Sequence, residues 1–168
     1  ICDDEQMVDD MKAYIEVIAP ERKNIVQFYD KPIPLMEYYN VEKQLKQSFG
    51  KHVNIPSSKG AYLVIEHTEA LHVIDVNSGN NISSGGAGNK DHALNVNKMA
   101  ATEIARQLRL RDMGGIIVID FIDMINADHR RDLYEHLKKE MSRDKARHKI
   151  LPPSKFGLIQ LTRQRTRQ

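Results

Sequence analysis

Two aspartates that close apolar runs carry the clearest chemical signal in the sequence. Asp75 follows Leu71–Ile74, and Asp120 follows Ile116–Ile119. An ionised carboxylate at the end of an apolar strand is costly unless a cation or hydrogen bonds compensate it. If the two strands are neighbours, both carboxylates emerge at the carboxyl edge of the sheet, where open α/β sheets bind ligands. Two hard oxygen ligands there suit a Mg²⁺ ion, although each aspartate could equally cap the turn or helix that follows it.

Two more polar residues lie close to these aspartates in the sequence. Asn77 comes two residues after Asp75 and would point to the same side of an extended strand. There it could position a carboxylate, a water molecule or a phosphate oxygen, or it could simply open the polar loop of residues 77–90. Asp123, one turn beyond Asp120, is either a third acid or, as we favour, a cap.

Several other kinds of site are excluded by the sequence. The seven histidines do not have the spacing of a zinc site, and there is no P-loop, dinucleotide fingerprint or nucleophile-elbow serine. The single cysteine, Cys2, excludes an internal disulfide framework and favours a reducing, cytoplasmic location. No apolar run reaches the roughly 18 to 20 residues of a membrane-spanning helix.

Basic residues gather in the C-terminal part of the chain. Residues 130–168 hold twelve basic and four acidic residues, whereas the whole sequence has 25 Lys and Arg against 23 Asp and Glu. This imbalance suits a polyanionic partner, or it is only the solvated surface of helices. With six tyrosines, four phenylalanines and no tryptophan, the chain offers few platforms for stacking bases. The candidate contacts to a nucleic-acid backbone are Arg106 and Arg109, Lys138 and Arg143, together with Arg130, Arg131, Lys139, Lys145, Lys155, Arg163, Arg165 and Arg167.

The hydrophobic pattern predicts the elements that must position these side chains. Strands at 61–66 and 70–76, three residues apart, predict a hairpin, and the apolar run from Ile116 predicts a strand buried on both faces. The order strand, loop, helix, strand, helix over 70–146 indicates an α/β fold, a mixed sheet with flanking helices and neighbouring parallel strands. Helices are predicted over 4–18, 41–49, 91–112 and 128–146, and further strands over 24–29, 116–121, 149–151 and 157–162.

Three long segments resemble the ribonuclease E/G family of endoribonucleases. Gly60–Ser78 resembles the strand pair that leads into the family's IDxNS motif. Glu103–Met124, with its VIDF sequence, resembles the family's most distinctive signature, and Ser154–Arg165 matches its FGLxxxxRQR segment. The resemblance covers essentially the whole chain.

The resemblance implies a catalytic role for three residues. Asp75 and Asp120 fall on the two aspartates that hold catalytic Mg²⁺ in the family, and Asn77 falls on the asparagine that helps to orient the site. It therefore implies a Mg²⁺-dependent endoribonuclease that hydrolyses single-stranded RNA to 5′-phosphate products during rRNA processing and mRNA decay. It assigns no catalytic role to Asp123.

The resemblance also implies a domain plan. Residues 1–57 are similar to the end of an RNase H-like subdomain, and residues 58–168 to a DNase I-like catalytic subdomain through which we expect a homodimer. Because both ends of the sequence look cut from something longer, we expect the S1 domain, the 5′-monophosphate pocket and the CxxC zinc-link elsewhere. The alternative is a catalytically silent dimerisation fragment of such an enzyme.

Overall fold

The chain folds as two compact units. A computed structural model describes residues 1–79 and 88–166, so the middle of the predicted polar loop and Arg167 lie outside the described residues. The units are Ile1–Gln47 and Ser48–Gln168. The assignment of an RNase H-like and a DNase I-like subdomain, with a boundary after residue 57, stays a prediction.

The first unit is helical among its described residues. The predicted helix over 4–18 is confirmed as α1 (Glu5–Ile18). Asp4 caps this helix by accepting a hydrogen bond from the backbone N–H of Met7 at 2.8 Å. The elements that follow are the 3-10 helix η1 (Pro20–Ile25), α2 (Leu35–Tyr38) and α3 (Val41–Ser48).

The strand predicted over 24–29 is wrong. Pro20 stands at the start of η1, where its fixed φ favours a helical turn, and that turn runs on to Ile25. Phe28 then forms an isolated bridge with Cys2 instead of a strand.

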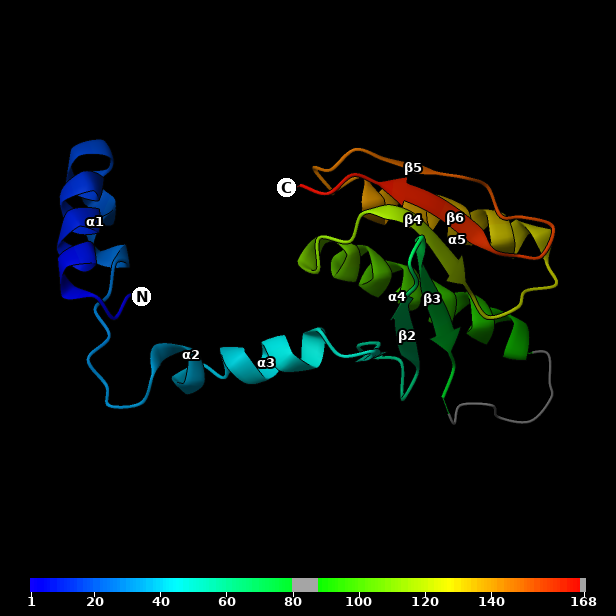
Figure 1. Ribbon diagram of the computed structural model, residues 1–168, viewed down its shortest axis with the longest axis horizontal. Coiled ribbons are helices and arrows are strands. Elements are labelled where there is room, and N and C mark those ends of the chain that lie inside the picture. Colours follow the sequence, from blue (N-terminus) through cyan, green and yellow to red (C-terminus); the bar gives the residue numbers. More distant parts are fainter. Residues whose placement is uncertain (80–87, 167–168) are drawn as a thin grey trace. The chain divides into compact units, whose positions relative to one another are not determined.

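The second unit is built on a six-stranded mixed sheet in the order β1-β2-β3-β4-β6-β5 (Figure 1). The predicted hairpin is confirmed as the antiparallel pair β2–β3, and the predicted parallel neighbours are β3 and β4. The other neighbouring strands are antiparallel, so the predicted α/β class with a mixed sheet is confirmed. The strands are β1 (His52–Asn54), β2 (Tyr62–His67), β3 (Leu71–Asn77), β4 (Gly115–Asp120), β5 (His148–Ile150) and β6 (Ile159–Arg163).

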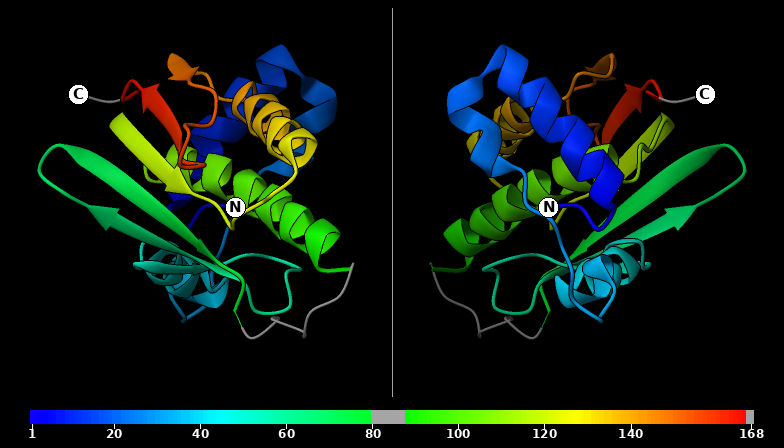
Figure 2. Two further views of the ribbon diagram at one scale, coloured as in Figure 1. Left: turned by 90° about the vertical axis from the view of Figure 1, so that its right-hand side faces the viewer. Right: turned by 90° about the vertical axis from the view of Figure 1, so that its left-hand side faces the viewer.

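Two helices, α4 (Gly88–Leu110) and α5 (Ala127–Met141), pack on one face of this sheet. Both lie behind the strands in Figure 1, and the turned views of Figure 2 place them on the same side. Ile104, Leu108 and Leu137 are completely buried between the helices and the sheet. Each such side chain contributes about 1.5–3 kcal/mol through burial of apolar surface.

The apolar run from Ile116 predicted a strand buried on both faces. This prediction is wrong, because only one face of β4 is buried. Ile117 and Ile119 are fully buried on the helix side, whereas Ile116 is 49% exposed and Val118 is half-buried on the other side. In the described part of the second unit no helix covers that other face. We call it the open face of the sheet.

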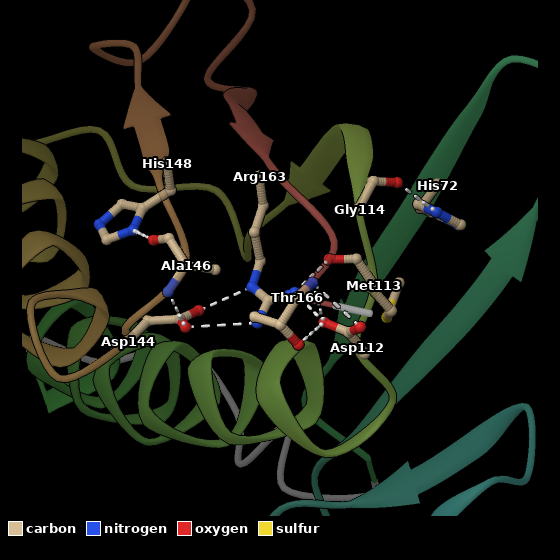
Figure 3. Close-up of polar contacts among 9 residues, drawn as sticks. All are labelled: His72, Asp112, Met113, Gly114, Asp144, Ala146, His148, Arg163 and Thr166. Atoms are coloured by element: carbon tan, nitrogen blue, oxygen red, sulfur yellow. Dashed lines mark hydrogen bonds and ion pairs between the residues drawn. The ribbon is translucent and has the colours of Figure 1, made fainter. Parts of the chain in front are cut away.

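A buried ion-pair cluster ties the sheet to the helix layer at the beginning of β4 (Figure 3). The Arg163 side chain is 2% exposed, and its Nε donates to Asp144 Oδ2 at 2.7 Å. Its Nη1 donates to Asp112 Oδ1 and to the Met113 carbonyl, both at 2.9 Å. Burial alone would raise the pKa of Asp144, but the hydrogen bonds from Arg163 and from the Ala146 N–H hold that pKa below its usual value.

This cluster corrects one prediction. Arg163 was a candidate contact to a nucleic-acid backbone, but its guanidinium is buried and engaged by two carboxylates. It is therefore a structural residue. Separately, none of the described helices has both the length and the apolar composition needed to cross a membrane.

Candidate active site

Asp75 and Asp120 are neighbours at the carboxyl edge of the parallel pair. Asp75 is close to the end of β3, Asp120 is the last residue of β4, and the two are register partners. Both side chains are exposed. The expectation that two separate apolar runs bring their aspartates to one edge is confirmed, while the catalytic role of these residues stays a prediction.

Strand alternation places both carboxylates on the open face. Ile74 and Val76, on either side of Asp75, are buried towards the helices, as is Ile119 before Asp120. Because successive side chains of a strand point to opposite faces, the two aspartates point away from the helix layer. The site is thus accessible from the side of the sheet that α4 and α5 leave uncovered.

Asn77 lies beside this pair and contacts it directly. Its Nδ2 donates a hydrogen bond to Asp75 Oδ2 at 2.8 Å. The predicted position of Asn77 on the same side as Asp75 is confirmed. This contact fixes the orientation of the Asp75 carboxylate, which is what a positioning residue at a metal site does.

The electrostatics of Asp120 favour a cation. Although the Asp120 residue is exposed, partial desolvation of its carboxyl and the negative charges of Asp75 and Asp123 raise the pKa of that carboxyl above its usual value. A divalent cation between Asp75 and Asp120 would replace this repulsion with attraction. The described residues contain no group of three or more His, Cys, Asp or Glu side chains placed to hold a metal. Two carboxylates nevertheless fit Mg²⁺, which keeps several water ligands and often binds through one or two carboxylates and phosphate.

Asp123 does not cap α5, contrary to the preferred interpretation. Asn126 is the cap, because its Oδ1 accepts a hydrogen bond from the backbone N–H of Asp128 at 2.8 Å. Asp123 instead lies exposed in the β4–α5 loop, where its charge acts on Asp120.

Asn97 is a structural contributor to the site that the sequence did not single out. It is fully buried in α4, donates through Nδ2 to the Ile122 carbonyl at 2.8 Å and accepts from the Ile122 N–H at 3.0 Å. These two bonds hold the loop that follows Asp120. A polar residue within the buried stripe of a helix, next to Val96, is the signal that could have revealed it.

The four side chains predicted to contact RNA are not brought to the aspartates. Each has a partner within the helix layer: Arg106 is bidentate to Glu103, Arg109 reaches the Glu140 carbonyl, Lys138 pairs with Glu135, and Arg143 pairs with Glu140.

Their position along the sheet also separates them from the site. Arg109 lies in the last turn of α4, shortly before Gly115 opens β4, whereas Asp120 closes that strand. Arg143 precedes Asp144, which binds Arg163, the register partner of Gly115. These basic residues therefore lie towards the opposite end of the strands, and their contact with RNA stays a prediction.

The protein is thus of the α/β class, with a pair of carboxylates at the ends of two neighbouring parallel strands. The chain belongs to the Ribonuclease E/G family, whose model matches residues 1–166. It is 41% identical over 167 residues to the chloroplastic Ribonuclease E/G-like protein of Arabidopsis thaliana, covering 99% of this chain and 16% of that protein.

Two bacterial relatives agree with this assignment. The chain is 41% identical over 165 residues to Ribonuclease E of Haemophilus influenzae, covering 98% of the chain and 17% of the relative. It is 40% identical over 149 residues to Ribonuclease G of Salmonella typhimurium, covering 89% of the chain and 30% of the relative. The chain thus spans about a sixth of the length of the first two relatives.

Proposed function

We propose that the chain is the catalytic-core segment of a Mg²⁺-dependent endoribonuclease that hydrolyses single-stranded RNA to 5′-phosphate products. The observation that carries the proposal is the register pair Asp75–Asp120 on the open face of the sheet. The names of the relatives, Ribonuclease E and Ribonuclease G, support ribonuclease activity. Processing of ribosomal RNA and decay of messenger RNA in the cytoplasm are the roles that we propose for the whole protein.

Asp75 and Asp120 would hold the magnesium ion in this proposal. When bound, Mg²⁺ polarises the phosphoryl oxygen and lowers the pKa of water, so that no protein side chain has to serve as the nucleophile. Asn77 keeps the Asp75 carboxylate oriented through its 2.8 Å hydrogen bond. Asp123 adds negative charge beside Asp120, which strengthens the attraction of the site for a cation.

The decisive measurement is cleavage of a 5′-monophosphorylated, AU-rich single-stranded RNA with Mg²⁺ or with EDTA. We expect Asp120→Asn to abolish Mg²⁺-dependent cleavage while circular dichroism shows an intact fold. Asn77→Ala should lower the rate roughly 10- to 100-fold, the usual cost of losing a group that orients a metal ligand. Asn24→Ala, on an exposed position of η1, is the matched control and should cleave normally.

Each outcome has a distinct meaning. Cleavage that persists in EDTA or in Asp120→Asn would contradict the assignment of the site. If the unmodified chain cleaves RNA neither with Mg²⁺ nor with EDTA, cleavage requires further RNA-binding parts beyond this segment. That result would favour the second candidate function.

That second candidate is a catalytically silent dimerisation fragment of such an enzyme. The open face favours it, because Ile116 is 49% exposed there and Val73 and Val118 beside it are only half-buried. Exposed apolar surface on a sheet is typical of a face that another chain covers.

A further inference from the structure

A groove of about 650 Å³ opens between the β4–α5 loop, the first half of α5 and the hairpin loop of residues 152–157. We call it the hairpin groove. Phe121, the residue directly after Asp120, forms part of its lining, and so does Asp123. Asp75, Asn77 and Asp120 do not line the groove, so it adjoins the candidate active site through the loop that follows Asp120.

The charge of the groove suits a polyanion. Arg130, Arg131 and Lys155 line it, against the single acid Asp123. Arg130 is committed to structure, because its Nη1 donates to the carbonyls of Met124 and Ile125 at 2.5 and 2.9 Å. Its guanidinium still contributes positive charge to the groove.

Arg131 and Lys155 remain the better placed cations for a bound group. Arg131 is 78% exposed and lies 3.5 Å from the equally exposed carboxylate of Asp128. Such an exposed pair is weak and exchanges readily for a phosphate. Lys155 is exposed on the opposite wall of the groove, in the hairpin loop.

Phe156 gives the groove an aromatic surface. Its side chain is 88% exposed, which is unusual for a phenylalanine next to a buried core. The hairpin loop holds it there: the Gly157 N–H donates to the Ser154 carbonyl at 3.0 Å, and the Phe156 N–H donates to Ser154 Oγ at 3.3 Å. Gly157 has φ +84°, a conformation that glycine adopts without strain.

A polar and aromatic groove of this kind fits one nucleotide of a single strand. Base stacking on an aromatic ring needs an unpaired base, and the flanking phosphates need cations within reach of the same ring. Tyr134 is a second aromatic residue in the lining. A double helix would keep its bases stacked on each other and could not offer one to Phe156.

We propose that the hairpin groove binds a nucleotide of single-stranded RNA that lies next to the cleaved bond, with its base on Phe156 and its phosphates on Arg131 and Lys155. The inference rests on the proposed ribonuclease function for the identity of the ligand. It goes beyond that function because it names the residues that select an unpaired nucleotide beside Asp120.

The absence of tryptophan from the sequence makes a direct test possible. Phe156→Trp keeps an aromatic ring and introduces a single fluorophore into the groove. We expect an eight-nucleotide oligouridylate, added in EDTA so that no Mg²⁺-dependent hydrolysis occurs, to quench its emission saturably. Phe49→Trp, at a 54% exposed position outside the groove lining, is the matched reporter and should not respond.

Affinity measurements with a labelled oligouridylate complete the test. Phe156→Ala should bind roughly tenfold more weakly, the loss expected for one stacked base. Arg131→Ala combined with Lys155→Ala should also flatten the salt dependence, by about 0.7 in the log–log slope for each lost phosphate contact. Arg22→Ala combined with Lys23→Ala removes the same charge from the exposed η1 and should leave the slope unchanged.

The outcomes separate this proposal from the proposed function. Quenching in both reporters, equal losses in both charge variants, or no binding of oligouridylate would overturn the groove proposal. Mg²⁺-dependent cleavage by the unmodified chain with unchanged binding in the Phe156 and charge variants would overturn the groove alone. Selective quenching and loss of affinity without cleavage would support the groove and count against catalysis by this segment.

Discussion

At the scale of single residues, Asp120 is a carboxyl group whose surroundings favour its protonated form. Partial desolvation of its carboxyl and the charges of Asp75 and Asp123 raise its pKa. The folded chain therefore keeps this proton to a higher pH than the unfolded chain does. The group consequently lowers the free energy of unfolding as pH rises from the usual carboxyl range through its raised pKa.

Asp120→Asn should accordingly be more stable than the unmodified chain at pH 7 in EDTA, because it removes a repelled charge. Mg²⁺ should raise the thermal unfolding midpoint of the unmodified chain more than that of the variant. Thermal unfolding followed by circular dichroism, with Asp128→Asn as an exposed acidic control, measures both effects. Equal responses to Mg²⁺ in all three proteins would argue against a cation at Asp120.

Arg163 leads to a prediction about stability. Arg163→Gln leaves Asp144, 3% exposed, without its buried partner, and we expect a loss of about 3–5 kcal/mol in urea unfolding. Since the pKa of Asp144 is lowered, the pair stabilises the fold above the usual carboxyl range and loses this effect as pH falls. The difference from the unmodified chain should therefore shrink in acid. Lys149→Gln, exposed on β5, should have little effect, and an equal loss there would refute the buried-pair explanation.

The sequence could not reveal this role of Arg163. The FGLxxxxRQR segment presents it as one of several basic residues near the C-terminus, all with the same chemical type. Its partners Asp112 and Asp144 are 51 and 19 residues away in the chain. The pairing of β6 with β4 brings Asp112 to Arg163, and its pairing with β5 brings Asp144 there, so a surface contact was the reasonable but wrong prediction.

At the scale of elements, the loop from β4 to α5 depends on a side chain of another helix. Asn97→Leu would remove both hydrogen bonds to Ile122 and leave two backbone groups without partners. We expect a loss of roughly 1–3 kcal/mol and faster hydrogen exchange at the Ile122 amide. Asn95→Leu, the same substitution on an exposed position of the same helix, is the control. Unchanged exchange at Ile122 in Asn97→Leu would show that the loop is held by other contacts.

The accuracy of the predicted elements followed the type of signal. The β2–β3 hairpin and the helices α1, α4 and α5 were predictable because their apolar residues repeat with a clear period or are separated by a short turn. β1 was missed because three residues with one buried side chain, Val53, do not make a pattern. The run from Ile116 misled because four consecutive apolar residues conceal which of them faces the core.

At the scale of the whole molecule, we expect the chain to self-associate. Ile116, near the start of β4, and its half-buried neighbours present apolar surface that a second copy can cover, at the end of the strand opposite to Asp120. Sedimentation equilibrium, with and without Mg²⁺, should give a mass twice the 19.3 kDa of one chain. A mass of 19.3 kDa at all concentrations would contradict the homodimer.

The parallel pairing of β3 with β4 has a consequence for how the site is assembled. Its two acids belong to strands that are separated in the chain by all of α4, so that no local segment contains both. Contacts between distant segments pay the entropy of loop closure before they gain energy, and they form late in folding. During synthesis, a growing chain could attract magnesium to this edge only after Asp120 had emerged and the helix had docked. Binding of the proposed metal would then require a completed β3–α4–β4 crossover, and an interrupted chain would lack the proposed site.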